Sequence, residues 1–79
     1  MPLAFILVNC ELGSEESVIQ QLKQIQQVKE VSGTFGSYDV LAKIESPTTE
    51  ELKNAITSDV RKIDKVTGTL TLMGIENQG

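Results

Sequence analysis

The sequence predicts an α+β fold of the ferredoxin-like βαββαβ type, in which a four-stranded antiparallel sheet carries two helices on one face. The first observation behind this prediction is a repeat. Residues 29–35 and 64–70 both contain Val, Ser or Thr, Gly and Thr in that order, followed by a large apolar residue. A strand-like and a helix-like segment precede each copy, so the chain forms two strand–helix–strand units. Right-handed crossovers then place both helices on the same side of the sheet.

Length and composition limit this fold to a single small acidic domain over residues 1–79. A domain of this size buries only roughly 60% of the surface that its unfolded chain exposes. The net charge of −4 argues against nucleic-acid binding, because phosphate contacts need a basic face. The longest apolar run near the N-terminus is too short to span a membrane. We therefore expect a soluble, cytoplasmic protein.

The chain holds one cysteine, Cys10, and no histidine. A single cysteine cannot form an intrachain disulfide, which fits a reducing compartment. Without histidine, the chain lacks the usual base for a cysteine nucleophile and most zinc constellations. We therefore expect no cofactor, no metal and no catalysis, and we interpret Cys10 as a small apolar residue at the end of a strand.

Each element of the first unit has its own signal. Leu3–Val8 is apolar at every position, as in a strand covered on both faces. Ser14 is a good N-cap for a helix that ends near Gln26 or Gln27. The helix carries apolar residues at helical spacing, and the next strand alternates apolar with polar residues. The helix stripe is Val18, Ile19, Leu22 and Ile25, and the strand positions are Val31, Gly33 and Phe35.

The second unit repeats the pattern after a turn at residues 36–39. Val40–Glu45 alternates as a third strand, and a second helix starts strongly because Thr48 and Glu51 have capping-box spacing. Val66–Met73 alternates apolar residues with threonine as the fourth strand, and the tail from Gly74 stays unassigned. The stripe of the second helix is Leu52, Ile56, Val60 and Ile63.

The sheet face away from the helices is expected to be apolar, which predicts a dimer. A soluble monomer seldom exposes such a patch, and a second copy would bury it around a twofold axis. The alternative is a monomer whose open sheet face is solvent-exposed and only moderately apolar, because it includes threonines. We expect this face to carry Leu41, Met73 and one alternate set of the first strand, either Ala4, Ile6 and Val8 or Leu3, Phe5 and Leu7. The predicted interface residues are Ile6, Val8, Leu41 and Met73, and those facing the helices are Val31, Phe35, Val40, Ala42, Ile44, Leu70 and Leu72.

The turn at residues 36–39 carries functional groups that a turn does not need for its structure and that could bind a ligand. Gly36 can adopt a positive φ and expose backbone N–H groups, Tyr38 offers an aromatic plate with a polar tip, and Asp39 offers a carboxylate to an ammonium group. Together they suit a small zwitterion. A plain hairpin turn, in which Asp39 bonds local N–H groups, explains the same residues. From the residues alone both interpretations stay open.

The whole chain, over roughly residues 3–73, resembles the C-terminal effector domain of the Lrp/AsnC transcription regulators, called the RAM domain. The resemblance rests on the apolar segment Ala4–Val8, on Gly36-x-Tyr38-Asp39-Val40-Leu41-x-Lys43 and on Ile63-x-x-Val66-x-x-Thr69-x-Thr71. It implies a dimer built through facing sheets, association of dimers into rings such as octamers or decamers, and an amino-acid effector bound between dimers.

The resemblance also implies which residues bind the effector. The family's regulators carry an N-terminal helix-turn-helix domain, whereas this chain starts at Met1 directly before the first strand. The chain therefore resembles a stand-alone RAM domain, which would sense amino acids or co-assemble with full-length relatives. The implied ligand-binding residues are Thr34, Gly36, Ser37, Tyr38 and Asp39 around the turn, with Thr69, Thr71 and Met73 from the last strand.

Three other classes remain as alternatives. The chain could be a purely structural assembly module or a heteromeric adaptor for full-length regulators. It could be a small enzyme on the same sheet, similar to dimeric α/β-barrel monooxygenases, although it has no Trp, no His and a single Tyr. It could also resemble an ACT-like domain, whose ligand-binding glycine typically follows the first strand, where Gly13 lies. The main hypothesis is a non-enzymatic regulatory module that binds an amino acid and oligomerises.

Overall fold

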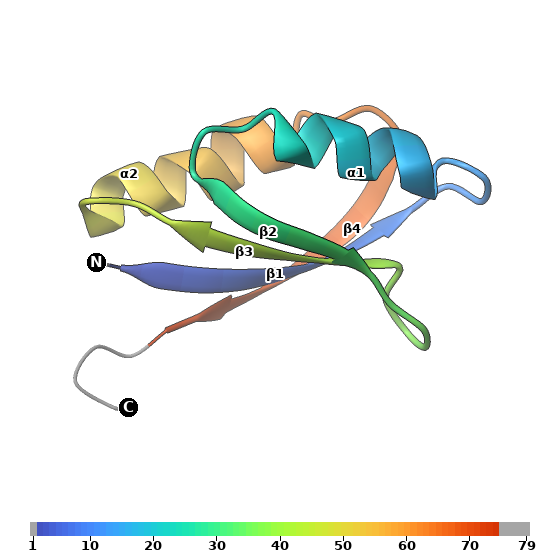
Figure 1. Cartoon of the computed structure of the whole chain (residues 1–79), viewed down its shortest axis with the longest axis horizontal. Helices are drawn as coiled ribbons and strands as arrows, with labels where there is room; N and C mark the ends of the chain where they lie inside the picture. Colours follow the sequence, from blue (N-terminus) through green and yellow to red (C-terminus); the bar gives the residue numbers. More distant parts are fainter. Residues whose placement is uncertain (1, 75–79) are drawn as a thin grey trace.

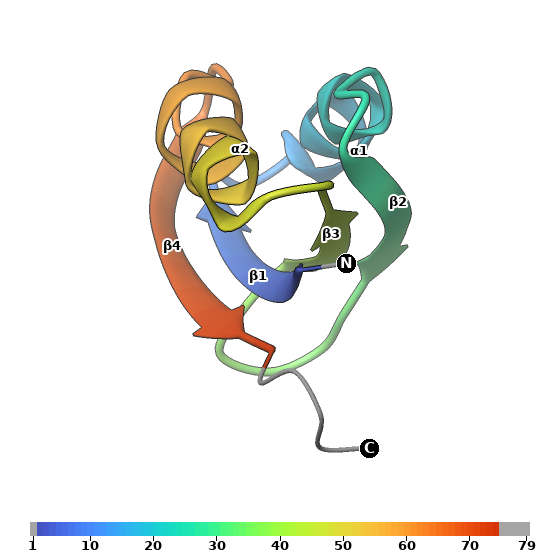
Figure 2. The ribbon, with the colours of Figure 1, turned by 90° about the vertical axis from the view of Figure 1, so that its left-hand side faces the viewer.

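The computed structural model describes residues 2–74, and the tail beyond Gly74 lies outside the described residues. The four strands form one antiparallel sheet in the order β2-β3-β1-β4. Both helices cover one face of this sheet, which confirms the predicted ferredoxin-like sandwich (Figures 1 and 2). The elements are β1 (Leu3–Cys10), α1 (Glu15–Lys23), β2 (Val28–Gly33), β3 (Val40–Glu45), α2 (Thr49–Asn54), the π-helical segment η1 (Ala55–Val60) and β4 (Val66–Met73).

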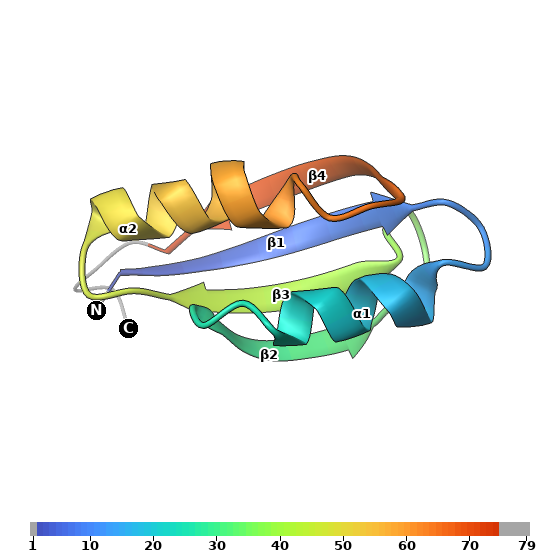
Figure 3. The same ribbon diagram turned by 90° about the horizontal axis from the view of Figure 1, so that it is seen from above.

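Local signals explain where the helices begin and end. The Thr48 side chain accepts a hydrogen bond of 3.1 Å from the Glu51 N–H, as the capping-box spacing predicts. α1 ends at Lys23, earlier than expected, because Ile25 reaches the core from a tight turn. In that turn the Ile25 N–H donates to the Leu22 carbonyl at 3.1 Å. Seen from above, α1 lies over β2 and β3, and α2 with η1 lies over β1 and β4 (Figure 3).

The core lies between the sheet and the helices. Its members come from the helix-facing sides of β1 and β3 and from the inner faces of the helical segments. Burial of this apolar surface is the main stabilising contribution to the fold. The buried residues are Ala4, Ile6, Val8, Val18, Leu22, Val40, Ala42, Ile44, Leu52, Ala55, Ile56, Val60 and Ile63.

The strand register corrects the predicted position of Ile6 and Val8. Directly opposite residues in antiparallel strands point to the same face. Ile6 pairs with Ala42 and Thr71, and both Ile6 and Val8 are 0% exposed beneath the helices. The prediction that Ile6 and Val8 form an open-face interface is therefore wrong. β1 is apolar on both faces, so its sequence contains no information on which alternate set faces the helices.

The register also corrects the fourth strand. Leu70 pairs with Leu7 and Leu72 with Phe5, so these side chains lie on the open face, where Leu70 and Leu72 are 43% and 51% exposed. Met73 pairs with Ala4 and takes the helix side, contrary to the prediction. β4 is an edge strand, so the helix side tolerates its threonines and the large residues turn to the open face. Phe35 lies beyond the end of β2 and is fully exposed, not in the core.

The open face therefore has a defined apolar patch, which we call the open-face patch. Leu41 belongs to it as predicted, because it pairs with Leu7, whose other neighbour is Leu70. An ion pair of 3.8 Å between Lys43 and Glu45 lies beside it on the same face. The members of the open-face patch are Leu3, Phe5, Leu7, Leu41, Leu70 and Leu72.

Candidate functional site

The β2–β3 turn is held to the sheet by hydrogen bonds centred on Asp39. The Asp39 N–H donates to the Val8 carbonyl at 3.0 Å, and the Asp39 carbonyl accepts from the Thr34 N–H at 2.9 Å. The Asp39 carboxylate oxygen Oδ2 accepts from the Cys10 N–H at 3.0 Å. The Thr34 hydroxyl donates to the Tyr38 carbonyl at 2.6 Å. These bonds fix both ends of the turn against the C-terminal end of β1.

The tip of the turn is exposed while its base is half-buried. Gly36 and Ser37 are exposed, and Thr34, Tyr38 and Asp39 are half-buried. Gly36 has a φ of +110°, which favours glycine, and a Cβ added there would meet no atom within 4 Å. The need for glycine is thus conformational. The turn projects on the side of the sheet away from the helices (Figures 1 and 2).

The candidate residues from β4 lie at increasing distances from this turn. Thr69 pairs with Val8, the residue that also receives the Asp39 N–H. Thr71 and Met73 pair with Ile6 and Ala4, roughly 7 and 13 Å further along the strand at 3.3 Å per residue. One chain therefore brings Thr34 and residues 36–39 together. The three β4 residues pair with helix-facing residues of β1 and so point to the helix side, away from the turn, with only Thr69 level with it along the strand.

The link between Asp39 and Cys10 was missed by sequence reasoning. The two residues are 29 positions apart. β1 runs two residues past its last pair with β3, Val8–Val40, so the Cys10 N–H has no strand partner on that side and the Asp39 carboxylate supplies the acceptor. No local sequence pattern marks such a position. Asp39 is therefore structural as well as a candidate ligand group.

The chain matches the family model of the Lrp/AsnC ligand binding domain over residues 3–77. The chain belongs to the Lrp/AsnC family. It is 37% identical over 71 residues to the HTH-type transcriptional regulator FL11 of Pyrococcus furiosus, a match covering 90% of this chain and 46% of that protein. The chain thus spans about half the length of this regulator, and it corresponds to the family's ligand-binding regulatory domain.

Solved structures agree with this assignment. Protein PHS023 of Pyrococcus horikoshii superposes with a TM-score of 0.90 at 33% identity, covering 99% of this chain and 94% of that one. The regulator NMB0573 of Neisseria meningitidis, crystallised as a complex with L-Met, has a TM-score of 0.84 at 12% identity, covering 99% of this chain and 52% of that one. The second likeness shows the shared fold alone.

One relative of a different kind is a homocitrate synthase of Sulfurisphaera tokodaii. It is 39% identical over 69 residues, which make up 86% of this chain and 15% of that enzyme. FL11 and NMB0573, by contrast, are transcriptional regulators. In the described part of the Lrp/AsnC domain no helix has the length and apolarity to cross a membrane. Within residues 2–74 no group of three or more His, Cys, Asp or Glu is placed to hold a metal ion.

The environment of Cys10 keeps its thiol protonated at neutral pH. Burial raises the pKa of this thiol above its ordinary value of 9.0, and the negative charges of Asp39 and Glu15 and a side-chain hydrogen bond to Asp39 raise it further. Because the thiolate is the nucleophilic form, the native thiol is a poor nucleophile.

Replacing Cys10 with serine is expected to leave the fold and ligand binding intact, at a stability cost of about 0.5–2 kcal/mol, because a polar hydroxyl replaces a half-buried thiol of similar volume. The raised pKa also predicts that the native state of the wild type loses stability as pH rises above 9.0, where the unfolded thiol ionises first. Thermal melts at pH 7 and pH 10 check both points. The serine variant should show less alkaline destabilisation, and an equal loss would contradict this role of the thiol.

Proposed function

We propose that this Lrp/AsnC domain binds a free amino acid at the β2–β3 turn and regulates the assemblies that it joins. The observation that carries the proposal is the preorganised turn, whose base is bonded to β1 while Gly36 and Ser37 stay exposed. A carboxylate accepts several hydrogen bonds. Asp39 can therefore hold an ammonium group while its Oδ2 keeps the Cys10 N–H. Exposed backbone N–H groups and the Ser37 hydroxyl suit the carboxylate of the same ligand.

The proposed assembly begins with a dimer through the open-face patch. Burying ~400 Å² of apolar surface at ~25 cal/mol per Å² contributes on the order of 10 kcal/mol before association costs. Dimers then associate into larger rings, and the amino acid lies between them. Thr71 and Met73 lie apart from the turn within one chain, so in this arrangement they could reach the ligand only from a neighbouring copy.

The comparisons support the amino-acid class through one relative and a role with different partners through two others. The same fold in NMB0573 was crystallised with L-Met. Related sequences occur in HTH-type regulators and in part of a homocitrate synthase, which is the distribution expected of a ligand module that serves different partners. That distribution also favours a second candidate, an adaptor that joins full-length Lrp/AsnC regulators without a ligand of its own.

A thermal melt against each of the twenty amino acids at millimolar concentration tests the proposal. A ligand that binds only the native state stabilises it by about 2.7 kcal/mol when present at 100 times its dissociation constant. For a domain of this size each kcal/mol raises the melting temperature by roughly 4–8 °C. A shift for one or a few amino acids is expected. No shift for any would favour the adaptor.

Two variants separate the ligand role of the turn from its structural role. Ser37→Ala is expected to weaken the shift without changing the melting temperature of the free protein, because Ser37 is exposed. Asp39→Ala should abolish the shift and also cost about 1–3 kcal/mol of stability, because the Cys10 N–H loses its acceptor. Asp64→Ala, at an exposed acid outside the turn, is the matched control. Retention of the full shift in Asp39→Ala would exclude the turn as the binding site.

A further inference from the structure

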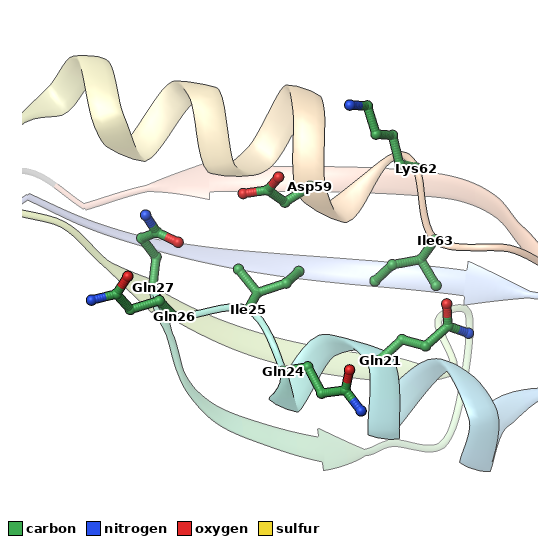
Figure 4. Close-up of a pocket in the computed structure, with 8 residues that line it drawn as sticks. All are labelled: Gln21, Gln24, Ile25, Gln26, Gln27, Asp59, Lys62 and Ile63. Carbon is green, nitrogen blue, oxygen red and sulfur yellow. The ribbon is translucent and has the colours of Figure 1, made fainter.

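A groove lies between α1 and the helical segment α2–η1, on the face of the molecule opposite to the open-face patch. Its first part is a hollow of about 590 Å³ between the end of α1 and the end of η1 (Figure 4). A second hollow of about 450 Å³ continues it along α2. Gln26, Gln27 and Asp59 line both hollows, so the two form one continuous groove. We call it the inter-helix groove.

The walls and floor of the inter-helix groove have different chemistry. Ile25 and Ile63 face each other across its floor (Figure 4). Four glutamines, Gln21, Gln24, Gln26 and Gln27, line the first hollow from the α1 side. A glutamine amide has two donor hydrogens and one acceptor oxygen, without charge. An array of such amides over an apolar floor matches a peptide backbone, which alternates donors with acceptors and carries side chains.

The opposite wall contributes carboxylates. Glu51, Ala55 and Asp59 follow one another at four-residue spacing along α2 and η1, and all three line the groove. The α-helical rise of 1.5 Å per residue gives an upper limit of about 12 Å for the distance between the two acids along the axis, because the π-helical part rises less per residue. Within residues 2–74 Asp59 belongs to neither of the ion pairs that form, Lys43–Glu45 and Lys65–Glu11.

Two lysines also line the groove. Lys62 extends away from the floor between Ile25 and Ile63 (Figure 4). The Lys29 ammonium donates to the Gln26 carbonyl at 3.3 Å, which occupies one of its three hydrogens. The carboxylates of Glu45, Glu51 and Asp59 outnumber these two ammonium groups in the lining, in a chain whose net charge is −4.

Asp59 also lies in an unusual backbone segment. η1 is a π-helix of six residues, Ala55–Val60, and it interrupts what the sequence predicts as one continuous helix to Ile63. π-helical turns are rare and occur frequently at functional sites. The segment that departs from regular helix is thus the one that presents Asp59 to both hollows.

We propose that the inter-helix groove binds an extended peptide segment of a partner protein that carries two basic residues. The distance from Glu51 to Ile63 along the helical wall is about 18 Å at 1.5 Å per residue, which an extended segment of five or six residues spans at 3.3 Å each. Basic residues four positions apart lie about 13 Å apart on the same side of that segment. They would meet Asp59 and Glu51, while an apolar residue beyond the one that meets Asp59 would reach Ile25 and Ile63. This surface is independent of the effector turn.

The test uses the whole chain and two capped peptides with lysines four positions apart and a leucine two positions outside them, placed before the first lysine in one peptide and after the second in the other. Two-dimensional ¹⁵N NMR should show saturable shifts of the side-chain amide signals of Gln21, Gln24, Gln26 and Gln27. Asp59→Lys is expected to weaken binding at least tenfold, because it replaces attraction by repulsion. Asp64→Lys, at an exposed acid that does not line the groove, should bind within about twofold of wild type. If Asp59→Lys fails to fold, Glu51→Lys at an exposed position carries the same test.

Each of the following four outcomes would contradict the proposed peptide site. Equal weakening by Asp59→Lys and Asp64→Lys would mean only long-range attraction to an acidic protein. Equal binding of a peptide with both lysines changed to glutamate would remove the charge argument. Full competition by a linear polyamine at the same concentration as the peptide would assign the groove to small amines. Absence of shifts at millimolar peptide would exclude a peptide site. The amino-acid thermal shift should persist in Asp59→Lys. A negative result for the peptide therefore leaves the proposed effector site untouched, and the reverse also holds.

Discussion

Replacing Leu41 with lysine is expected to convert the proposed dimer into a monomer. Leu41 pairs with Leu7 on β1, and Leu7 pairs with Leu70 on β4, so Leu41 stands at one end of an apolar row that crosses the open face. A second copy that covers this row would bury the new ammonium group without a partner. The effective cost of burying an unpaired charge is several kcal/mol, and the apolar contact of leucine is lost as well.

Light scattering coupled to size-exclusion chromatography gives the mass that checks this expectation. Leu12→Lys is the matched control, because Leu12 is fully exposed in the loop before α1 and is absent from the open-face patch. The control should keep the wild-type mass. An unchanged mass for Leu41→Lys, or a monomeric wild type at every concentration tested, would rule out the open-face patch as the interface.

The fold could be predicted from sequence because its signals are local and repeated. The capping spacing of Thr48 and Glu51 sets the start of α2, and the alternation over Val40–Glu45 marks a strand that is buried on one side. The strand–helix–strand order occurs twice, as the ferredoxin-like topology requires. The local structural preference of each segment agrees with the overall fold, and this agreement is what allows the fold to be predicted from the sequence.

The faces of the sheet were less predictable, for two physical reasons. β1 lies in the middle of the sheet and is apolar on both sides, so Ile6 and Leu7 are equivalent in the sequence although only Ile6 is in the helix-side core. β4 lies at the edge, where the helices cover less, and its leucines face the open side. Which alternate set is buried depends on register against neighbouring strands, and register is a long-range property.

The candidate site was predictable only as a turn. Its position between β2 and β3 and the positive φ of Gly36 follow from residue type. The bond from the Cys10 N–H to Asp39 does not follow from residue type, because it depends on β1 running past the end of the β1–β3 ladder, where it meets a carboxylate 29 residues away. This bond changes the expected effect of removing Asp39 from loss of binding alone to loss of binding together with loss of stability.

Replacing Ile6 with alanine is expected to be the most destabilising of the single core truncations on β1. Ile6 is 0% exposed and is among the largest fully buried side chains. Ile-to-Ala changes at such sites cost about 2–5 kcal/mol, from lost transfer free energy together with the cavity left behind. At roughly 4–8 °C per kcal/mol for a domain of this size, the melting temperature should fall by at least about 8 °C.

Leu12→Ala, at a fully exposed leucine, should leave the melting temperature within a few degrees and serves as the control. The comparison of Ile6→Ala with Leu7→Ala then tests the face assignment. Leu7→Ala should weaken dimerisation more than it lowers the stability of the domain, because Leu7 belongs to the open-face patch. A register displaced by one residue would exchange the two positions, since every side chain of a strand then changes face. A small cost for Ile6→Ala with a large cost for Leu7→Ala would therefore place Leu7 in the core and Ile6 at the interface.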